Sequence, residues 1–184
     1  MLTPYIILGI AALAGFWLIL AYNRLVRLRQ QAVEALSDID VQLKRRFDLI
    51  PNLVETVKGY MAHERETLES VTRARTEFMS AHTPREQAQA NDMLSNTLKT
   101  LFAVSESYPD LKANANFLDL QRELADTENK IQAARRFYNA NVRDLNIRIE
   151  SFPTNFIAGG FGFKRMEFFE AEAPQEREPI PVKF

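Results

Sequence analysis

The chain has 184 residues, with 23 basic and 24 acidic side chains, two histidines and no cysteine. This length suits one domain with an appendage, and the near balance of charge argues against a nucleic-acid-binding protein, which would need a basic excess. The lack of cysteine excludes disulfides, thiolate metal sites, iron–sulfur clusters and cysteine nucleophiles.

The first segment, residues 1–22, has the composition of a membrane span. No charged side chain occurs between Leu2 and Asn23, and about 20 helical residues cross the ~30 Å hydrocarbon core of a bilayer. We therefore predict a transmembrane anchor, with tyrosines near its two ends at the membrane interfaces. The residues expected to face lipid are Tyr5, Ile6, Ile7, Leu8, Phe16, Trp17, Leu18, Ile19, Leu20 and Tyr22.

A cleaved signal peptide is the alternative interpretation of this segment. Such a peptide carries positive charge before its apolar run, whereas residues 1–4 carry none beyond the terminal amine. The basic residues follow the run instead, at Arg24, Arg27 and Arg29. Because basic flanks remain on the cytoplasmic side, the pattern predicts an N-terminus outside the cell and the bulk of the chain in the cytoplasm.

Residues 23–151 are predicted to form a cytoplasmic helical bundle. Apolar residues recur at steps of three and four from Leu25 to Ile50, which predicts a nearly straight helix that continues directly from the anchor. Pro51 should kink or break this helix. The apolar pattern then resumes from Leu53 to Phe78.

Two further helices are expected in the bundle. One covers residues 84–106, with Thr83 as its N-cap and Pro84 at its first position. The longest helix after the first covers residues 114–151, and short connections favour antiparallel neighbours. The predicted fold class is all-α: a transmembrane helix continuing into an antiparallel bundle of about four long helices.

The C-terminal end differs in composition from the bundle. Residues 152–169 are rich in phenylalanine and glycine, which predicts an irregular segment that packs on the bundle or enters a membrane or partner groove. The tail, residues 170–184, is acidic and contains proline, and should be extended or disordered unless a partner binds it. The side chains expected to contact a partner or lipid are Phe156, Phe161, Phe163, Phe168 and Phe169.

Polar residues along the bundle helices predict a hydrogen-bonded network that fixes helix register, with a solvated face as the alternative. The basic run at residues 44–46 could instead bind lipid headgroups. On a straight helix, however, it lies ~30 Å beyond the membrane surface, where attraction is largely screened, so acids nearby or on a neighbouring helix are the better partners. The expected network residues are Arg45, Arg46, Asp48, Asn52, Glu64, Glu128, Arg135 and Asn139.

The sequence predicts no catalytic, cofactor-binding or metal-binding residue. His63 and Glu64 resemble the start of a zinc-protease motif, but the second ligand position holds Thr67. A hydrolase would need paired carboxylates, for example Glu64 with Glu128. Their spacing gives no evidence of proximity.

Several long motifs resemble the bacterial LemA family. They are VQLKRRFDLIPNLVETVKGYMAHE at residues 41–64, YPDLKANANF at 108–117, ENKI at 128–131, ARRFYN at 134–139 and the FP ending from residue 152. The resemblance covers about residues 22–169 and leaves out the tail. It implies a single-pass membrane protein with a helical-bundle domain and no established catalytic residue. Relatives are linked to magnetosome membrane formation and to membrane-embedded metalloproteases.

These observations together predict a non-enzymatic scaffold or adaptor of the bacterial inner membrane. The expected partners are the lipid bilayer, further copies of the chain or another membrane protein, and no nucleic acid. One alternative is a membrane-remodelling protein that inserts its Phe-rich segments. Another is a membrane protein that assists a membrane-embedded protease.

Overall fold

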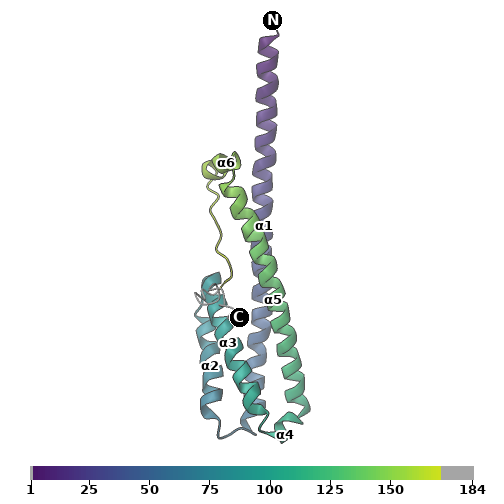
Figure 1. Cartoon of the computed structure of the whole chain (residues 1–184), viewed down its shortest axis with the longest axis vertical. Helices are drawn as coiled ribbons and strands as arrows, with labels where there is room; N and C mark the ends of the chain where they lie inside the picture. The colour runs from purple at the N-terminus through teal and green to yellow at the C-terminus, as the bar shows by residue number, and fades with distance from the viewer. Residues whose placement is uncertain (1, 171–184) are drawn as a thin grey trace, which may run out of the picture. The chain divides into compact units, whose positions relative to one another are not determined.

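A computed structural model describes residues 2–170 (Figure 1). Within these residues the chain is helical and contains no strand, which confirms the all-α prediction. The expectation of an extended acidic tail concerns residues 170–184, of which residues 171–184 lie outside the described part. The helices are α1 (Thr3–Lys58), α2 (Arg65–Met79), α3 (Pro84–Ser105), α4 (Pro109–Lys112), α5 (Ala115–Glu150) and α6 (Thr154–Gly160).

Helix α1 passes through Pro51 without ending, so the predicted break at this proline is wrong. Pro51 is itself exposed, while Ile50, Leu53 and Val57 around it are buried in one apolar cluster. Burial of such side chains contributes about 1.5–3 kcal/mol each, which outweighs the ~3 kcal/mol that an internal proline costs. The helix ends instead at Lys58, before Gly59.

A loop at residues 59–64 separates α1 from α2, where the apolar pattern from Leu53 to Phe78 had predicted a continuous helix. The next boundary agrees with the sequence. The Thr83 hydroxyl accepts a hydrogen bond from the Glu86 amide, and the Glu86 carboxylate accepts one from the Thr83 amide, forming a capping box in front of Pro84.

The chain divides into two compact units. Among the described residues, the four-helix unit consists of Val41–Gln132 together with Phe169 and Glu170. Its long segments are the second part of α1, α2, α3 and the first part of α5, and successive segments run in opposite directions (Figure 1). Its core contains Leu94, Leu101 and Phe117 from α3 and α5.

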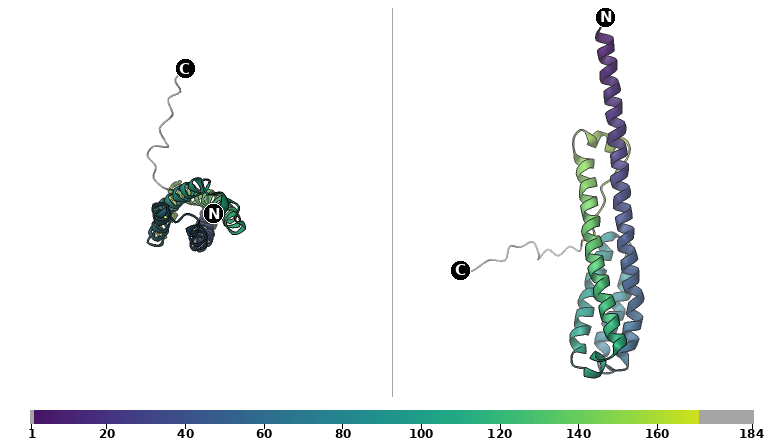
Figure 2. Two further views of the ribbon diagram at one scale, coloured as in Figure 1. Left: turned by 90° about the horizontal axis from the view of Figure 1, so that it is seen from below. Right: turned by 90° about the vertical axis from the view of Figure 1, so that its right-hand side faces the viewer.

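The hairpin unit consists of Met1–Asp40 and Ala133–Phe168. Here the first part of α1 and the second part of α5 run antiparallel, and the short helix α6 closes the end of α5 (Figure 2). Leu25, Leu145, Ile157 and Ala158 form the apolar cluster that joins these three helices. Helix α6 lies within the segment that was predicted to be irregular.

Candidate functional site

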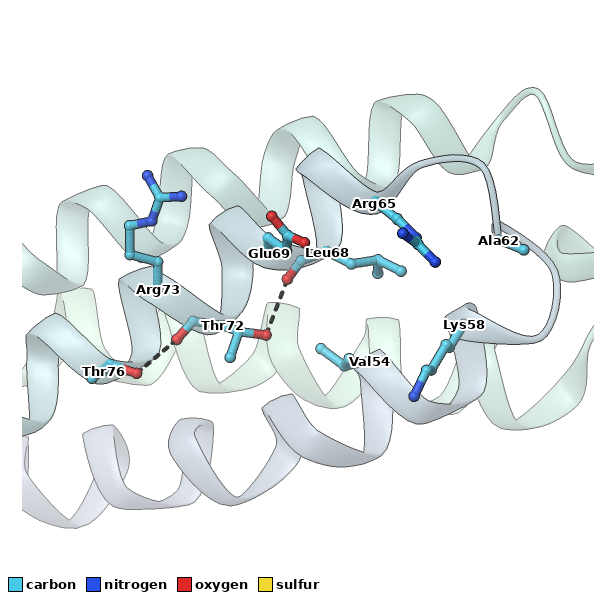
Figure 3. Close-up of a pocket in the computed structure, with 9 residues that line it drawn as sticks. All are labelled: Val54, Lys58, Ala62, Arg65, Leu68, Glu69, Thr72, Arg73 and Thr76. Carbon is cyan, nitrogen blue, oxygen red and sulfur yellow. Dashed lines mark hydrogen bonds between the residues drawn. The ribbon is translucent and has the colours of Figure 1, made fainter.

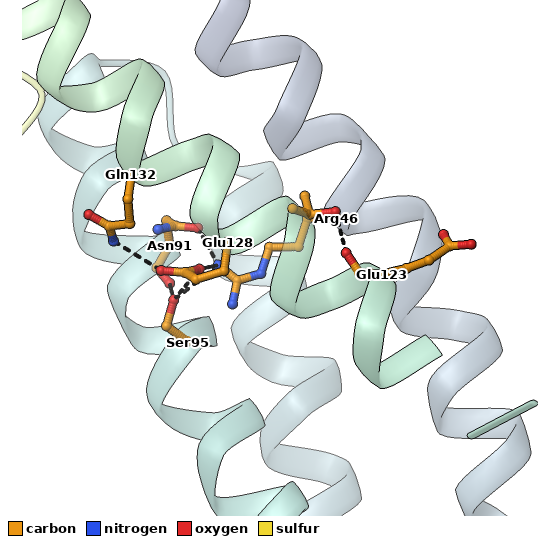
Figure 4. Close-up of polar contacts among 7 residues, drawn as sticks. Arg46, Asn91, Ser95, Glu123, Glu128 and Gln132 are labelled. Atoms are coloured by element: carbon orange, nitrogen blue, oxygen red, sulfur yellow. Dashed lines mark hydrogen bonds and ion pairs between the residues drawn. The ribbon is translucent and has the colours of Figure 1, made fainter. Parts of the chain in front are cut away.

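A buried polar layer crosses the four-helix unit at Arg46 (Figure 4). This side chain from α1 is 4% exposed, although it occurs in a run of three basic residues. Its Nη1 atom donates hydrogen bonds to Asn91 Oδ1 at 2.7 Å, to Ser95 Oγ at 3.0 Å and to Glu128 Oε2 at 2.6 Å. Three helices therefore meet at one guanidinium group.

Burial and neighbouring negative charges shift the pKa of Arg46 in opposite directions. Burial lowers the pKa of Arg46, while the charge of Glu128, its hydrogen bond to Arg46 and the charge of Asp92 raise it. Glu128 also accepts a hydrogen bond from Gln132 Nε2 at 2.9 Å. Because a buried cation is stable only when it is paired and hydrogen-bonded, the layer requires α1, α3 and α5 to keep one register.

Two atoms of the layer, Arg46 Nε and Asn91 Nδ2, are buried and have no hydrogen-bond partner among the described residues. A cavity of about 210 Å³ lies beside Arg46, Ser95 and Glu128, and is otherwise lined mainly by apolar side chains. Within residues 2–170, the hydrogen-bonding groups of the polar layer are thus only partly paired.

The structure distributes the sequence-predicted network residues over several places. Arg46 and Glu128 meet in the buried layer. On α1 next to it, the Arg45 guanidinium lies 3.9 Å from Glu123 Oε2 and 3.7 Å from Asp126 Oδ2, both on α5. Two residues of the basic run, Arg45 and Arg46, thus pair with acids on a neighbouring helix. Sequence reasoning did not identify Asn91 and Ser95, because an Asn and a Ser four residues apart occur equally on solvated helix faces. Asp48 and Asn52 are exposed, and Arg135 and Asn139 lie in the hairpin unit.

Glu64 lies in the loop between α1 and α2, away from the helix interiors. Its Oε1 atom accepts a hydrogen bond from the Tyr108 hydroxyl at 3.0 Å, and this bond raises the pKa of Tyr108. Glu64 and Glu128 therefore have different partners. Among residues 2–170, no group of three or more His, Cys, Asp or Glu side chains could hold a metal ion.

An open groove of about 750 Å³ lies between the end of α1 and α2 (Figure 3). Val54 and Leu68 supply apolar surface, while Lys58, Arg65 and Arg73 supply positive charge. This combination suits an amphipathic partner better than a small polar ligand.

Aromatic side chains gather at the α5–α6 corner of the hairpin unit. Phe152, Phe156 and Phe161 are 80, 71 and 59% exposed. Phe163 packs on the apolar cluster that holds α6, Phe168 is half-buried and Phe169 is fully buried. Of the five phenylalanines expected to contact lipid or a partner, only Phe156 and Phe161 are therefore largely exposed.

Two polar contacts fasten the segment that follows α6 to α5. Asn146 donates from Nδ2 to the Met166 carbonyl at 2.9 Å and accepts from the Met166 amide at 3.0 Å. The Tyr138 hydroxyl donates to the Glu167 carbonyl at 2.7 Å, and burial together with the Glu167 charge raises the pKa of Tyr138 to about 12. These contacts fix the corner on its helix.

The predicted anchor forms the first part of α1. Among the described residues, α1 is the one helix that is long and apolar enough to cross a membrane, and the most apolar 18-residue window in it is not buried by the rest of the chain. Tyr5 and Trp17 are exposed, whereas Tyr22 contacts the ring of Phe161, with a centroid distance of 4.8 Å.

Sequence comparisons agree with these features. The model of the LemA family matches residues 35–184, so the match includes the tail that the motif resemblance left out. Two magnetosome proteins, MamQ 1 and MamQ 2 of Paramagnetospirillum magneticum, are each 27% identical to the chain over 189 residues, covering 89% of it and 69% of their own length. Protein LemA of Metamycoplasma hominis is 29% identical over 153 residues, covering 81% of the chain and 68% of its own length.

Proposed function

We propose, because the chain belongs to the LemA family, that it is a non-catalytic scaffold or adaptor of the bacterial inner membrane. The first part of α1 would cross the bilayer once. The two helical units would bind further copies of the chain or a second membrane protein. Two of the relatives are named for a cellular assembly, the magnetosome, rather than for a reaction.

The observation that carries this proposal is the contrast within α1. Its first part leaves large apolar side chains such as Ile7, Leu13 and Phe16 exposed, while later residues such as Leu43 and Leu53 are buried among the other helices. A contiguous exposed surface of many large apolar side chains marks a contact with a membrane or with another protein. Since α1 is one helix that continues through Pro51, its apolar first part and its bundle-forming residues lie on one continuous helical backbone, although Pro51 itself donates no backbone hydrogen bond.

The basic residues after the apolar run support a cytoplasmic location for the part of the chain that follows Asn23. Arg24, Arg27 and Arg29 are all exposed on α1 directly after the uncharged segment. Because a basic flank is retained on the cytoplasmic side, the N-terminus would lie outside the cytoplasm.

The exposed surfaces favour lateral association. The groove between α1 and α2 combines apolar and basic residues, and Phe137 leaves 58% of its side chain exposed on α5. Exposed aromatic residues are enriched in protein interfaces. Each surface would be available to a partner lying beside the protein at the membrane.

Photo-cross-linking in native membranes tests the scaffold. A photoreactive side chain would replace Thr72 in the groove or Phe137 on α5, with Asp119, an exposed polar position on α5, as the control. Expected are cross-links to a second copy or to a discrete membrane protein from Thr72 or Phe137, and none from Asp119. Isolated monomers at both test positions would contradict the proposal.

Membrane remodelling is a second candidate, favoured by the exposure of Phe156 and Phe161. Apolar side chains inserted into one leaflet act as wedges. The full chain should then change the size or shape of vesicles into which it is reconstituted, as seen by electron microscopy. Unchanged vesicles would exclude this role and leave the scaffold intact.

A further inference from the structure

Three phenylalanine side chains at the α5–α6 corner, Phe152, Phe156 and Phe161, are exposed, although their neighbours in the sequence are buried in the core of the unit. Phe152 and Phe156 contact each other edge to face, with a centroid distance of 6.0 Å, and Phe161 follows α6. Between them, Ile157 and Ala158 are buried against α1 and α5. The corner therefore has an inner apolar face that holds it to the unit and an outer aromatic face, formed by Phe152, Phe156 and Phe161, that is largely exposed.

The position of this aromatic face is set by contacts within the hairpin unit. Phe161 contacts Tyr22 at 4.8 Å, and Phe163 contacts the same ring at 5.8 Å. Tyr22 is the penultimate residue of the uncharged run, and Arg24, the first charged residue, follows that run directly. The corner thus lies beside the residue at which the apolar part of α1 ends.

Aromatic side chains are enriched at this level of a bilayer. Tyr and Trp rings concentrate between the headgroups and the acyl chains, and Phe anchors interfacial helices to the same layer. A phenylalanine that stayed in water there would expose apolar surface within a few ångströms of hydrocarbon, whereas insertion contributes about 25 cal/mol per Å² of apolar area removed from water.

The charges around the corner suit an anionic bilayer. Arg24 and Arg27 are exposed on α1 next to Tyr22, and Lys164 is exposed after Phe163. Basic residues close to an anionic membrane surface are attracted to it. Arg165, which pairs with Glu150 at 2.9 Å, is already partly neutralised.

We propose that Phe152, Phe156 and Phe161 form a second membrane contact, inserted at the boundary between headgroups and acyl chains of an anionic bilayer, beside the end of the transmembrane segment. This contact deepens the proposed function and rests on its anchor. It requires no other protein, because α6 is fastened to α1 by Leu25, Ile157 and Ala158. The hairpin unit would thus touch the membrane at two points.

Fluorescence quenching by brominated lipids tests this contact in the full chain, reconstituted into phosphatidylcholine–phosphatidylglycerol vesicles. Trp17 is the only tryptophan in the chain, so Trp17→Phe gives a silent background for Phe156→Trp. The matched control is Phe137→Trp, an exposed phenylalanine of the same unit, located ~20 Å before the end of α5.

Lipids brominated near the headgroup should quench most of the emission of the Phe156→Trp chain and shift it to the blue, relative to Phe137→Trp. Equal quenching of both chains would overturn the inference. So would blue-shifted Phe156→Trp emission that brominated lipid quenches only after the protein is diluted in lipid, because that result indicates a second copy as the occupant. Trp17 in the unchanged chain tests the anchor separately. If bromines placed deep in the bilayer quench Trp17 while Phe156→Trp is not quenched, the second contact fails and the anchor stands.

Discussion

The ion pair between Arg46 and Glu128 gives a direct test of what holds the four-helix unit in register. Glu128→Gln keeps the side-chain shape but removes the negative charge from a guanidinium that is 4% exposed. Asn91 and Ser95 then remain as neutral acceptors, which do not offset the cost of burying a cation. Removing one partner of a buried pair costs about 3–5 kcal/mol, so we expect the free energy of unfolding to fall by about that amount.

Replacing the other partner of the ion pair should destabilise the unit less. In Arg46→Met the long side chain is kept, and Glu128 is left without its cation. The Glu128 side chain is 30% exposed and keeps its hydrogen bonds from Ser95 and Gln132. Water can reach this carboxylate, so we expect a loss of about 1–3 kcal/mol, the range for an unpaired polar group.

Denaturant unfolding of the full chain in detergent micelles, followed by helical circular dichroism, measures both effects. Asp119→Asn is the control, because its partner Arg122 and Asp119 itself are 76 and 69% exposed, and exposed pairs contribute about 0–1 kcal/mol. If Glu128→Gln and Asp119→Asn lower the free energy of unfolding by equal amounts, the structural role of the buried layer is refuted. Equal losses for Glu128→Gln and Arg46→Met would refute the argument from their different burial.

Three further predictions concern stability and use the same unfolding measurement. Tyr138 has its pKa raised from 10.0 to about 12, first by burial and then by the Glu167 charge. The unfolded chain therefore loses this proton at lower pH than the folded chain, so stability should fall as pH rises from 10 through 12, and Tyr138→Phe should remove this part of the pH dependence. Thr83→Ala deletes the hydroxyl that caps α3 and should cost about 1 kcal/mol; no change would mean that the cap is not formed. Ile157→Ser places a hydroxyl in the buried face of α6 and should destabilise by about 2–5 kcal/mol, whereas Phe156→Ser, at an exposed position, should change stability in detergent by less than about 0.5 kcal/mol.

The helical periodicity predicted the fold well where burial alone decides the structure. Leu25, Ile39 and Ile50, which belong to the apolar pattern from Leu25 to Ile50, are all buried. Periodicity failed at Pro51 and at the loop before α2, because it counts apolar positions and not the balance between a proline's local cost and the packing around it. The Thr83–Pro84 boundary was predictable because a cap is a local interaction.

The candidate sites were less predictable, since they depend on which helices face one another. Arg45 and Arg46 are adjacent in sequence, yet they differ in burial. Arg46 is buried among three helices, whereas Arg45 is 44% exposed and pairs with an acid of α5. Their 100° separation around a helix allows both outcomes, and only the packing of α3 and α5 selects between them. In the same way, Phe156 and Phe163 occur in one aromatic segment, but Phe156 is exposed on α6, whereas Phe163, after the end of α6, packs on the apolar cluster.

The hairpin unit also indicates why its corner should act on a membrane as a fixed element. Asn146 uses its amide as donor and acceptor to one residue, Met166, so the chain that leaves α6 is held by paired hydrogen bonds rather than by apolar contact alone. Apolar packing is non-directional, and it would allow α6 to slide along α1. Paired hydrogen bonds have directional geometry, and they hold the returning chain in one register on α5. The depth of the aromatic face would then follow from the depth of Tyr22, and any partner that shifted α1 in the bilayer would move both membrane contacts together.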